Sequence, residues 1–178
     1  RAERPDELWV VDFTYVPTWS GMAFTAFVTD VYSRRIVGWR TMSQMPTDLP
    51  LDALEMALWV RDRAGQDVTG VIQHSDAGAQ YTALRYTERL TDVGAIASIG
   101  TVGDSYDNAL AESGIGLFKT EVIRRRGPWH SLDAVEFATL EWVDWFNNRR
   151  LLGPVGNIPP AEAEERYYEQ LEAPALAA

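Results

Sequence analysis

Cysteine is absent from this chain, and histidine and lysine are scarce. Without cysteine there is neither a disulfide framework nor a thiolate metal site, which suits a reducing cytoplasm. Two histidines are too few for a typical zinc site. No apolar run approaches the roughly 18 residues that a membrane span requires. These absences argue against a disulfide-rich domain, a zinc enzyme and a membrane-spanning protein.

Length and composition indicate one globular domain. The chain has 178 residues, of which 46% are hydrophobic, so it can bury a sizeable core. It begins Arg-Ala-Glu-Arg-Pro, without an initiator Met or a signal-peptide pattern. We therefore expect a fragment of a longer protein, with a core over residues 1–170 and a disordered tail over 171–178.

Acidic residues outnumber basic ones, and the formal net charge is −10. Such a balance argues against bulk, non-specific affinity for nucleic acid. The arginines are nevertheless clustered, at Arg34–Arg35, Arg124–Arg126 and Arg149–Arg150. Because the local field decides docking, these clusters are candidate DNA contacts. The alternative is that they are ordinary solvated arginines.

Hydrophobic periodicity predicts an α/β fold. Three strands separated by short turns come first and form an antiparallel meander. Two further strands are reached through helical crossovers, and helices then cover both faces of a five-stranded mixed sheet, three strands antiparallel and two parallel. The predicted strands are 8–16, 22–30, 36–40, 71–74 and 95–99. The predicted helices run from an Asp48 cap to Gly65, over 82–92, over 106–123, from a Ser131 cap through Phe146, and over 161–170.

Three acidic residues are the candidate catalytic groups. Asp12 lies within a strand that helices should cover, where an uncompensated carboxylate is costly and requires a partner or a metal. Asp76 follows the fourth strand, and Glu112 lies in a helical run, with residues 77–111 between them. Carboxylates from separate elements suit a pair of hard divalent cations that support displacement at phosphorus. Taken singly, each has a plain alternative: a paired Asp, a turn or cap Asp, and a solvated surface Glu.

Lys119, the only lysine, follows Glu112 by about two helical turns and can reach a phosphate beside a metal site. The alternative is an exposed lysine. On a helical wheel Ile115 shares the side of Glu112 and Lys119, whereas Leu117 and Phe118 face the core. His74 precedes Asp76 by two residues, so it points to the same side if the strand persists. It either supports the metal ligands or contacts DNA, or it is structural.

The ordered set of motifs resembles the catalytic domain of retroviral-integrase-like transposases, in particular those of bacterial insertion sequences. The resemblance covers nearly the whole chain, and the complete ordered set is far more specific than any single motif. Its segments are 9–15, 29–39, 74–81, 103–113, 119–121, 142–150 and 159–162. The chain departs from the family pattern at Gly114–Ile115 and over residues 151–157, where a His-containing stretch is expected.

The resemblance implies an RNase H-like fold with an Asp-Asp-Glu metal triad, here Asp12, Asp76 and Glu112. It implies two Mg²⁺ or Mn²⁺ ions, with Asp12 bridging them. Its expected partners are the DNA of the element ends and of the target, and a second copy of the chain in a homodimer or higher oligomer. No membrane is involved. The expected DNA contacts are Lys119, Tyr106, Asn108, Arg124, Arg125, Arg149 and Arg150.

The expected activity is metal-dependent nicking of a DNA strand, followed by transfer of the 3′-hydroxyl end to a new strand. One alternative is another RNase H-like nuclease, which shares the metal chemistry but does not join strands. A second is a catalytically silent core that serves as an oligomerisation or DNA-scaffolding module. The helix that carries Trp142 and Trp145 could then support a subunit interface, although aromatics at this spacing also suit a core.

Overall fold

The computed structural model describes residues 2–44, 47–75, 78, 83–99 and 114–176. Five strands form one sheet in the order β3-β2-β1-β4-β5. Strands β1 and β2, and β2 and β3, pair antiparallel, whereas β4 is parallel to both β1 and β5. The predicted mixed sheet of three antiparallel and two parallel strands is therefore confirmed. The strands are β1 (Leu8–Thr18), β2 (Gly21–Asp30), β3 (Ile36–Met42), β4 (Ile72–Ser75) and β5 (Ile96–Ile99).

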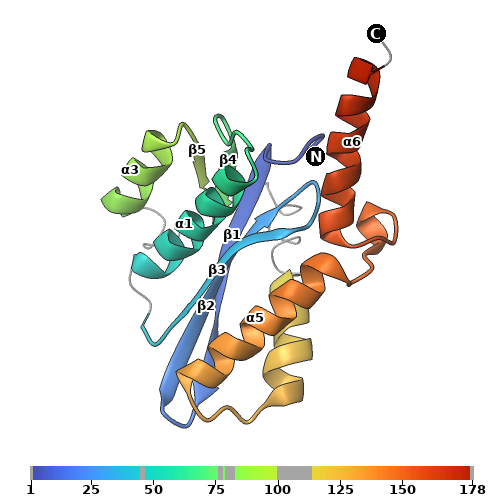
Figure 1. Ribbon diagram of the computed structural model, residues 1–178. Helices are drawn as coiled ribbons and strands as arrows, with labels where there is room; N and C mark the ends of the chain where they lie inside the picture. Colours follow the sequence, from blue (N-terminus) through green and yellow to red (C-terminus); the bar gives the residue numbers. More distant parts are fainter. Residues whose placement is uncertain (1, 45–46, 76–77, 79–82, 100–113, 177–178) are drawn as a thin grey trace.

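Helices cover both faces of the sheet (Figure 1). Helices α1 (Asp48–Arg63) and α3 (Leu84–Asp92) pack on one face, where Trp9 and Val11 of β1 contribute to the core. The other face holds α5 (Leu132–Asn148) and the helix of residues 114–126, with Phe118 and Trp142 at its centre. The remaining elements are the π-helical segment η1 (Lys119–Arg124), the 3₁₀ turn η2 (Gly153–Val155) and α6 (Pro160–Leu176). Among the described residues, no helix combines the length and the apolar character needed to cross a membrane.

The structure can be compared with the predicted starts of α1 and α5 and with the predicted end of α6. Ser131 caps α5 as predicted, since its side chain accepts a hydrogen bond from the backbone of Ala134. The Asp48 cap is wrong: Thr47 occupies the cap position, and Asp48 instead accepts a hydrogen bond from Arg85 at 2.8 Å. Helix α6 is longer than the predicted 161–170 and runs to Leu176, so it enters the segment for which we predicted a tail.

Close packing fixes α1 against the sheet. A Cβ added at Gly38 of β3 would overlap the carbonyl oxygen of Ala53 and crowd Ala57. Only a residue without a side chain allows the helix backbone to approach the strand this closely. Gly38 and the small residues Ala53 and Ala57 thus allow α1 to pack closely on the edge strand β3.

Asn147 joins α5 to the start of β3. Its Oδ1 accepts a hydrogen bond from the backbone N–H of Ile36, and its Nδ2 donates to the carbonyl of Ile36, both at 2.9 Å. Asn147 is buried, so these bonds satisfy two main-chain groups at a site with little access to water. We call this pair of hydrogen bonds the Asn147 clamp; it fixes the position of α5 relative to β3.

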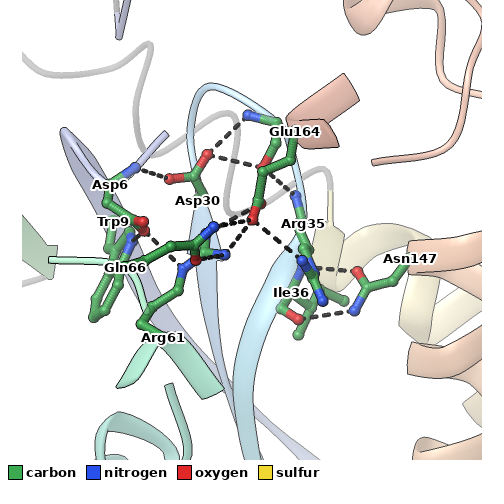
Figure 2. Close-up of polar contacts among 10 residues, drawn as sticks. Asp6, Trp9, Asp30, Arg35, Ile36, Arg61, Gln66, Asn147 and Glu164 are labelled. Carbon is green, nitrogen blue, oxygen red and sulfur yellow. Dashed lines mark hydrogen bonds and ion pairs between the residues drawn. The ribbon is translucent and has the colours of Figure 1, made fainter. Parts of the chain in front are cut away.

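A buried network of charged side chains connects the beginning of the chain to α1 and α6 (Figure 2). The Arg61 guanidinium donates through Nε to Asp6 at 2.8 Å and through both terminal nitrogens to Glu164. Asp6 also accepts a hydrogen bond from the Trp9 indole at 2.9 Å. Arg61, Asp6 and Glu164 are each at most 3% exposed. Buried charges of this kind are tolerated only when they are paired and hydrogen-bonded.

Asp30 occupies the same network at the end of β2. Its carboxylate accepts hydrogen bonds from the backbone N–H groups of Asp6 and Ser33, both at 2.8 Å, and from the Ser33 hydroxyl at 2.9 Å. Burial raises the pKa of Asp30 to about 6, and the two backbone hydrogen bonds only partly oppose that effect. For Glu164, burial acts in the same direction, but the hydrogen bonds and charge of Arg61 outweigh it and lower the pKa.

Replacing Asn147 with Ala is expected to lower the free energy of unfolding by about 1–3 kcal/mol, because two buried main-chain groups of Ile36 lose their partners. Urea denaturation measures this change. Asn148→Ala is the matched control, since Asn148 is exposed and, within the described ranges, its side chain bonds only to Asp144 in its own helix. Equal stability losses in the two variants would show that the clamp contributes nothing.

The raised pKa of Asp30 predicts a dependence of stability on pH. Between the unfolded pKa of 3.8 and the folded value of about 6, the native state keeps a proton that the unfolded chain has released. The free energy of unfolding should therefore fall as pH rises through this window, relative to an Asp30→Asn variant, by on the order of 2–3 kcal/mol. Urea denaturation of both proteins from pH 4 to pH 7 measures the difference. A difference that stays constant over this range would contradict the raised pKa.

Candidate active site

Asp12 lies in the middle of β1, the central strand of the sheet. It pairs with Phe27 of β2 and shares a small hollow with Val10, on the face that α5 and residues 114–126 cover. Its carboxylate is half-buried, and Oδ1 accepts a hydrogen bond from the backbone N–H of Phe13 at 2.7 Å. A carboxylate is thus held at the interface between the sheet and its helical layer.

The parallel pairing of β1 and β4 brings the end of β4 close to Asp12. Val10 is in register with His74, and Val11 with Ser75, which is the last residue of β4. Asp12 and Asp76 are the next residues of their two segments. Asp76 itself lies outside the described residues, so its position as a ligand stays a prediction.

His74 is buried on the face to which Val10 also belongs. Its Nδ1 lies 3.1 Å from the hydroxyl of Ser98, which the parallel pairing of β4 with β5 places in register. Its Nε2 is buried and has no hydrogen-bond partner among the described residues. The sequence identified His74, but not Ser98, because only the pairing of two strands brings Ser98 to it. Whether His74 supports metal ligands or contacts DNA stays a prediction.

The first described residues of the helix of residues 114–126 lie beside Asp12. Gly114 and Ile115 line the same hollow as Asp12, together with Trp142 of α5. Phe118 faces the core as predicted, but the placement of Ile115 on the opposite side is wrong. Ile115 is 6% exposed because the helix start packs against β2 and α5, so its face is covered as well. Glu112, two residues before Gly114, lies outside the described residues, as do Tyr106 and Asn108.

The predicted basic contacts fall into two groups. Lys119, Arg124, Arg125 and Arg149 are exposed, and none of them makes an ion pair within the described part of the chain. Arg150 is half-buried, pairs with Glu121, and lies over the ring of Trp145 at 5.3 Å. Contact with DNA therefore requires no rearrangement for the first group, but for Arg150 it would compete with Glu121.

Acidic and histidine side chains do not form a metal-binding cluster of three or more among the described residues. Two of the three predicted ligands fall outside that part of the chain, so the triad as a set is not tested by this geometry. Asp12 supplies the hard oxygen donor that Mg²⁺ and Mn²⁺ prefer. The donor chemistry present therefore fits the predicted ions.

Comparison with known proteins identifies relatives along almost the whole chain. Residues 2–105 match the Integrase core domain family, and residues 94–160 match a second family with the same description. The transposase for insertion sequence element IS629 of Shigella sonnei is 55% identical over 99% of this chain and 58% of its own length. A Mycobacterium tuberculosis protein whose name assigns it to insertion sequence element IS986/IS6110 is 54% identical over 96% of this chain and 62% of its own length. The chain thus spans about three fifths of these relatives.

Solved structures show the same fold at low sequence identity. The HTLV-2 integrase catalytic core domain, in complex with magnesium, is 14% identical with a TM-score of 0.65, over 92% of this chain and 99% of that one. The catalytic core domain of BIV integrase is 17% identical with a TM-score of 0.65, over 93% and 97%. The likeness confirms the expected RNase H-like fold. The sheet order, the family match and these relatives agree, and the chain belongs to the integrase core domain family.

Proposed function

We propose that this chain is the catalytic core of a DNA transposase, which nicks a DNA strand and transfers the resulting 3′-hydroxyl end with the help of divalent metal ions. The observation that carries the proposal is the location of Asp12. It lies beside the end of β4 on one side and the start of the 114–126 helix on the other. The names of the relatives, transposases of insertion sequences and retroviral integrase cores, support the same activity.

Asp12, Asp76 and Glu112 are the residues that would hold the ions. The register of β1 and β4 supports Asp76, because Ser75 pairs with Val11 and each candidate ligand is the next residue. The hollow beside Asp12 supports Glu112, because its described lining includes Gly114, two residues further along the chain. Two Mg²⁺ or Mn²⁺ ions would activate water or a 3′-hydroxyl and stabilise the leaving 3′-oxygen.

The protein itself contributes position and charge. Strand β1 is paired with β2 at Asp12 and with β4 up to the preceding residue, Val11, so the sheet holds the backbone at Asp12 before any ligand binds. His74 is buried on the same face, and its Nδ1 lies within hydrogen-bond distance of Ser98. Nε2 is therefore the nitrogen that would hydrogen-bond to a metal-binding carboxylate or to a DNA phosphate. The exposed cations Lys119, Arg124, Arg125 and Arg149 would bind DNA phosphates, which needs no base recognition.

We also propose that the chain acts as a homodimer or higher oligomer on DNA from the element ends and the target. The similar HTLV-2 integrase catalytic core domain has been solved in a trimeric and a dimeric form. Of the two tryptophans considered for an interface, Trp142 is a core residue, whereas Trp145 is 41% exposed. Helix α5 also exposes Phe137 and Leu140, so it has apolar surface available for contact.

Metal binding should stabilise the fold. At a Mn²⁺ concentration near ten times the dissociation constant, the native state gains about 1.4 kcal/mol, which corresponds to an increase of roughly 3–5 °C in Tm for a domain of this size. Differential scanning fluorimetry with and without MnCl₂ measures this. Asp12→Asn should abolish the increase, while Asp133→Asn, at an exposed position of α5, should keep it. A Tm that does not respond to millimolar Mn²⁺ would count against the metal site.

Asp12→Asn, Asp76→Asn and Glu112→Gln should each lower DNA nicking and joining by at least roughly 10³-fold, since each removes a charged metal ligand. Nicking is followed on supercoiled plasmid in MnCl₂, and joining with a labelled 3′-hydroxyl oligonucleotide and target plasmid. Normal strand transfer by the Asp76→Asn protein would end the assignment. Nicking without joining would favour another nuclease of this fold, and DNA binding without nicking would favour a silent scaffold.

A further inference from the structure

An exposed tryptophan stands at the turn between β1 and β2. Trp19 is 71% exposed, although tryptophan is a residue that proteins normally bury extensively. Its ring meets that of His130 edge to face, with centroids 4.0 Å apart. A single exposed aromatic side chain is common on protein surfaces and does not by itself indicate a binding site. The residues around Trp19 therefore decide whether it can bind a ligand.

The turn is attached firmly to the segment before α5. The backbone N–H of Trp19 donates to the carbonyl of Trp129 at 2.9 Å, and Thr18 forms a β-bridge with Trp129. Within the turn, Thr18 Oγ1 donates to the carbonyl of Gly21 at 2.6 Å. The Trp129 indole donates in turn to the carbonyl of Ile123 at 3.0 Å. The backbone that carries Trp19 is therefore fixed before any partner binds, which lowers the entropy cost of binding.

The surface beside the ring is positively charged in a strongly acidic protein. A hollow of about 330 Å³ lies next to Trp19, and its lining includes Arg124 and no acidic side chain among the described residues. Two nearby acids are already paired: Glu121 with Arg150, and Glu141 with Arg126. Arg124 and the adjacent Arg125 are left without carboxylate partners in the described structure, so their charges face solvent.

The π-helical segment Lys119–Arg124 affects the direction in which the cations of this helix point. In an α-helix, residues five apart point about 140° away from each other. In a π-helix, residue i bonds residue i+5, which turns the two towards a common face; such segments are frequent at functional sites. Lys119 and Arg124 are five apart, so the segment directs both cations along one line.

This line connects the Trp19 surface to the candidate active site. Thr18 follows Asp12 by six residues in the same strand, which corresponds to about 20 Å. In double-stranded DNA each strand advances about 3.4 Å per nucleotide. At that duplex spacing, the Trp19 surface is about six nucleotides from a phosphate held at Asp12, and a more extended single strand covers the distance with fewer.

We propose that the β1–β2 turn and residues 127–130 form a second contact for DNA, where an unpaired base stacks on Trp19 and the adjacent phosphates bind Arg124 and Arg125. The inference rests on the proposed function, because DNA is the partner in both, and it adds the aromatic surface of Trp19 to two arginines that were already expected to bind phosphates. Aromatic rings beside cations are the usual means of holding single-stranded nucleic acid without regard to sequence. The hollow beside the turn is lined by both Trp19 and Arg124, and no acidic side chain is among its described lining residues.

The test measures binding of a fluorescein-labelled 20-nucleotide single strand by fluorescence anisotropy in EDTA, so that no metal-dependent step contributes. Trp19→Ala should raise Kd by roughly 10-fold, and Trp19→Phe should restore most of the affinity, because a base stacks on either aromatic ring. Arg124→Ala should reduce the dependence of log Kd on log salt by about 0.7, the value for one phosphate on a single strand. Trp19→Ala should leave that slope unchanged.

Trp59→Ala is the matched control. Trp59 is 62% exposed on α1 and also has an arginine, Arg63, over its ring at 5.6 Å, but it lies on the opposite face of the sheet. Its replacement should leave Kd unchanged. Equal losses in Trp19→Ala and Trp59→Ala, or no loss in Trp19→Ala, would overturn the proposal. So would a Trp19→Ala protein that binds normally but changes its mass in light scattering, since Trp19 would then lie between copies of the chain.

Nicking in MnCl₂ separates this inference from the proposed function. Wild-type protein that nicks DNA, with normal binding by Trp19→Ala, would overturn the second contact and leave the catalytic assignment intact. Wild-type protein that fails to nick, with binding that depends on Trp19, would support the second contact and overturn the catalytic assignment.

Discussion

Parallel pairing between β1 and β4 is the constraint on which the rest of the structure depends. These two strands are far apart in the sequence, and their register places the end of β4 directly beside Asp12. Because β1 is also paired with β2 along its whole length, it cannot shift without breaking both ladders. The helical layer of α5 and residues 114–126 then closes over the same face. The geometry proposed for the active site is thus a consequence of sheet register.

Most of the fold could be predicted from the sequence, because alternation and helical spacing are local signals. The strands, their succession along the chain and the Ser131 cap follow from patterns that each span only a few residues, whereas the order of the strands in the sheet was not predicted. Contacts between distant residues have no such signal. The Asn147 clamp joins residues 111 apart, and Ser33 reaches Glu164 across 131 residues. Thr47, and not Asp48, occupies the cap position of α1, and the Asp48 side chain binds Arg85 instead. Because these two residues are 37 apart, a rule based on neighbouring residues does not predict their contact.

The part of the candidate site that could be predicted is the part that follows from residue type alone. Asp12 drew attention because a carboxylate is costly on a covered strand, and its location between β4 and the 114–126 helix agrees with that reasoning. Asp76 and Glu112 remain predictions. The basic residues show the limit of counting charges, since Arg150 is engaged by Glu121 while Arg124 and Arg125 face solvent. Only the packing of α5 against its neighbouring helix separates these cases.

The contact between Arg61 and Glu164 ties the C-terminal helix α6 to the buried interior of the fold. Glu164 lies in α6, beyond residue 160, and supplies two of the acceptors around a guanidinium that is 1% exposed. A truncated chain that ended before Glu164 would leave the Arg61 guanidinium with only Asp6 and Gln66 as hydrogen-bond partners among those described. Helix α6 is therefore part of the cooperative unit, and a protease that removes it would be expected to trigger unfolding.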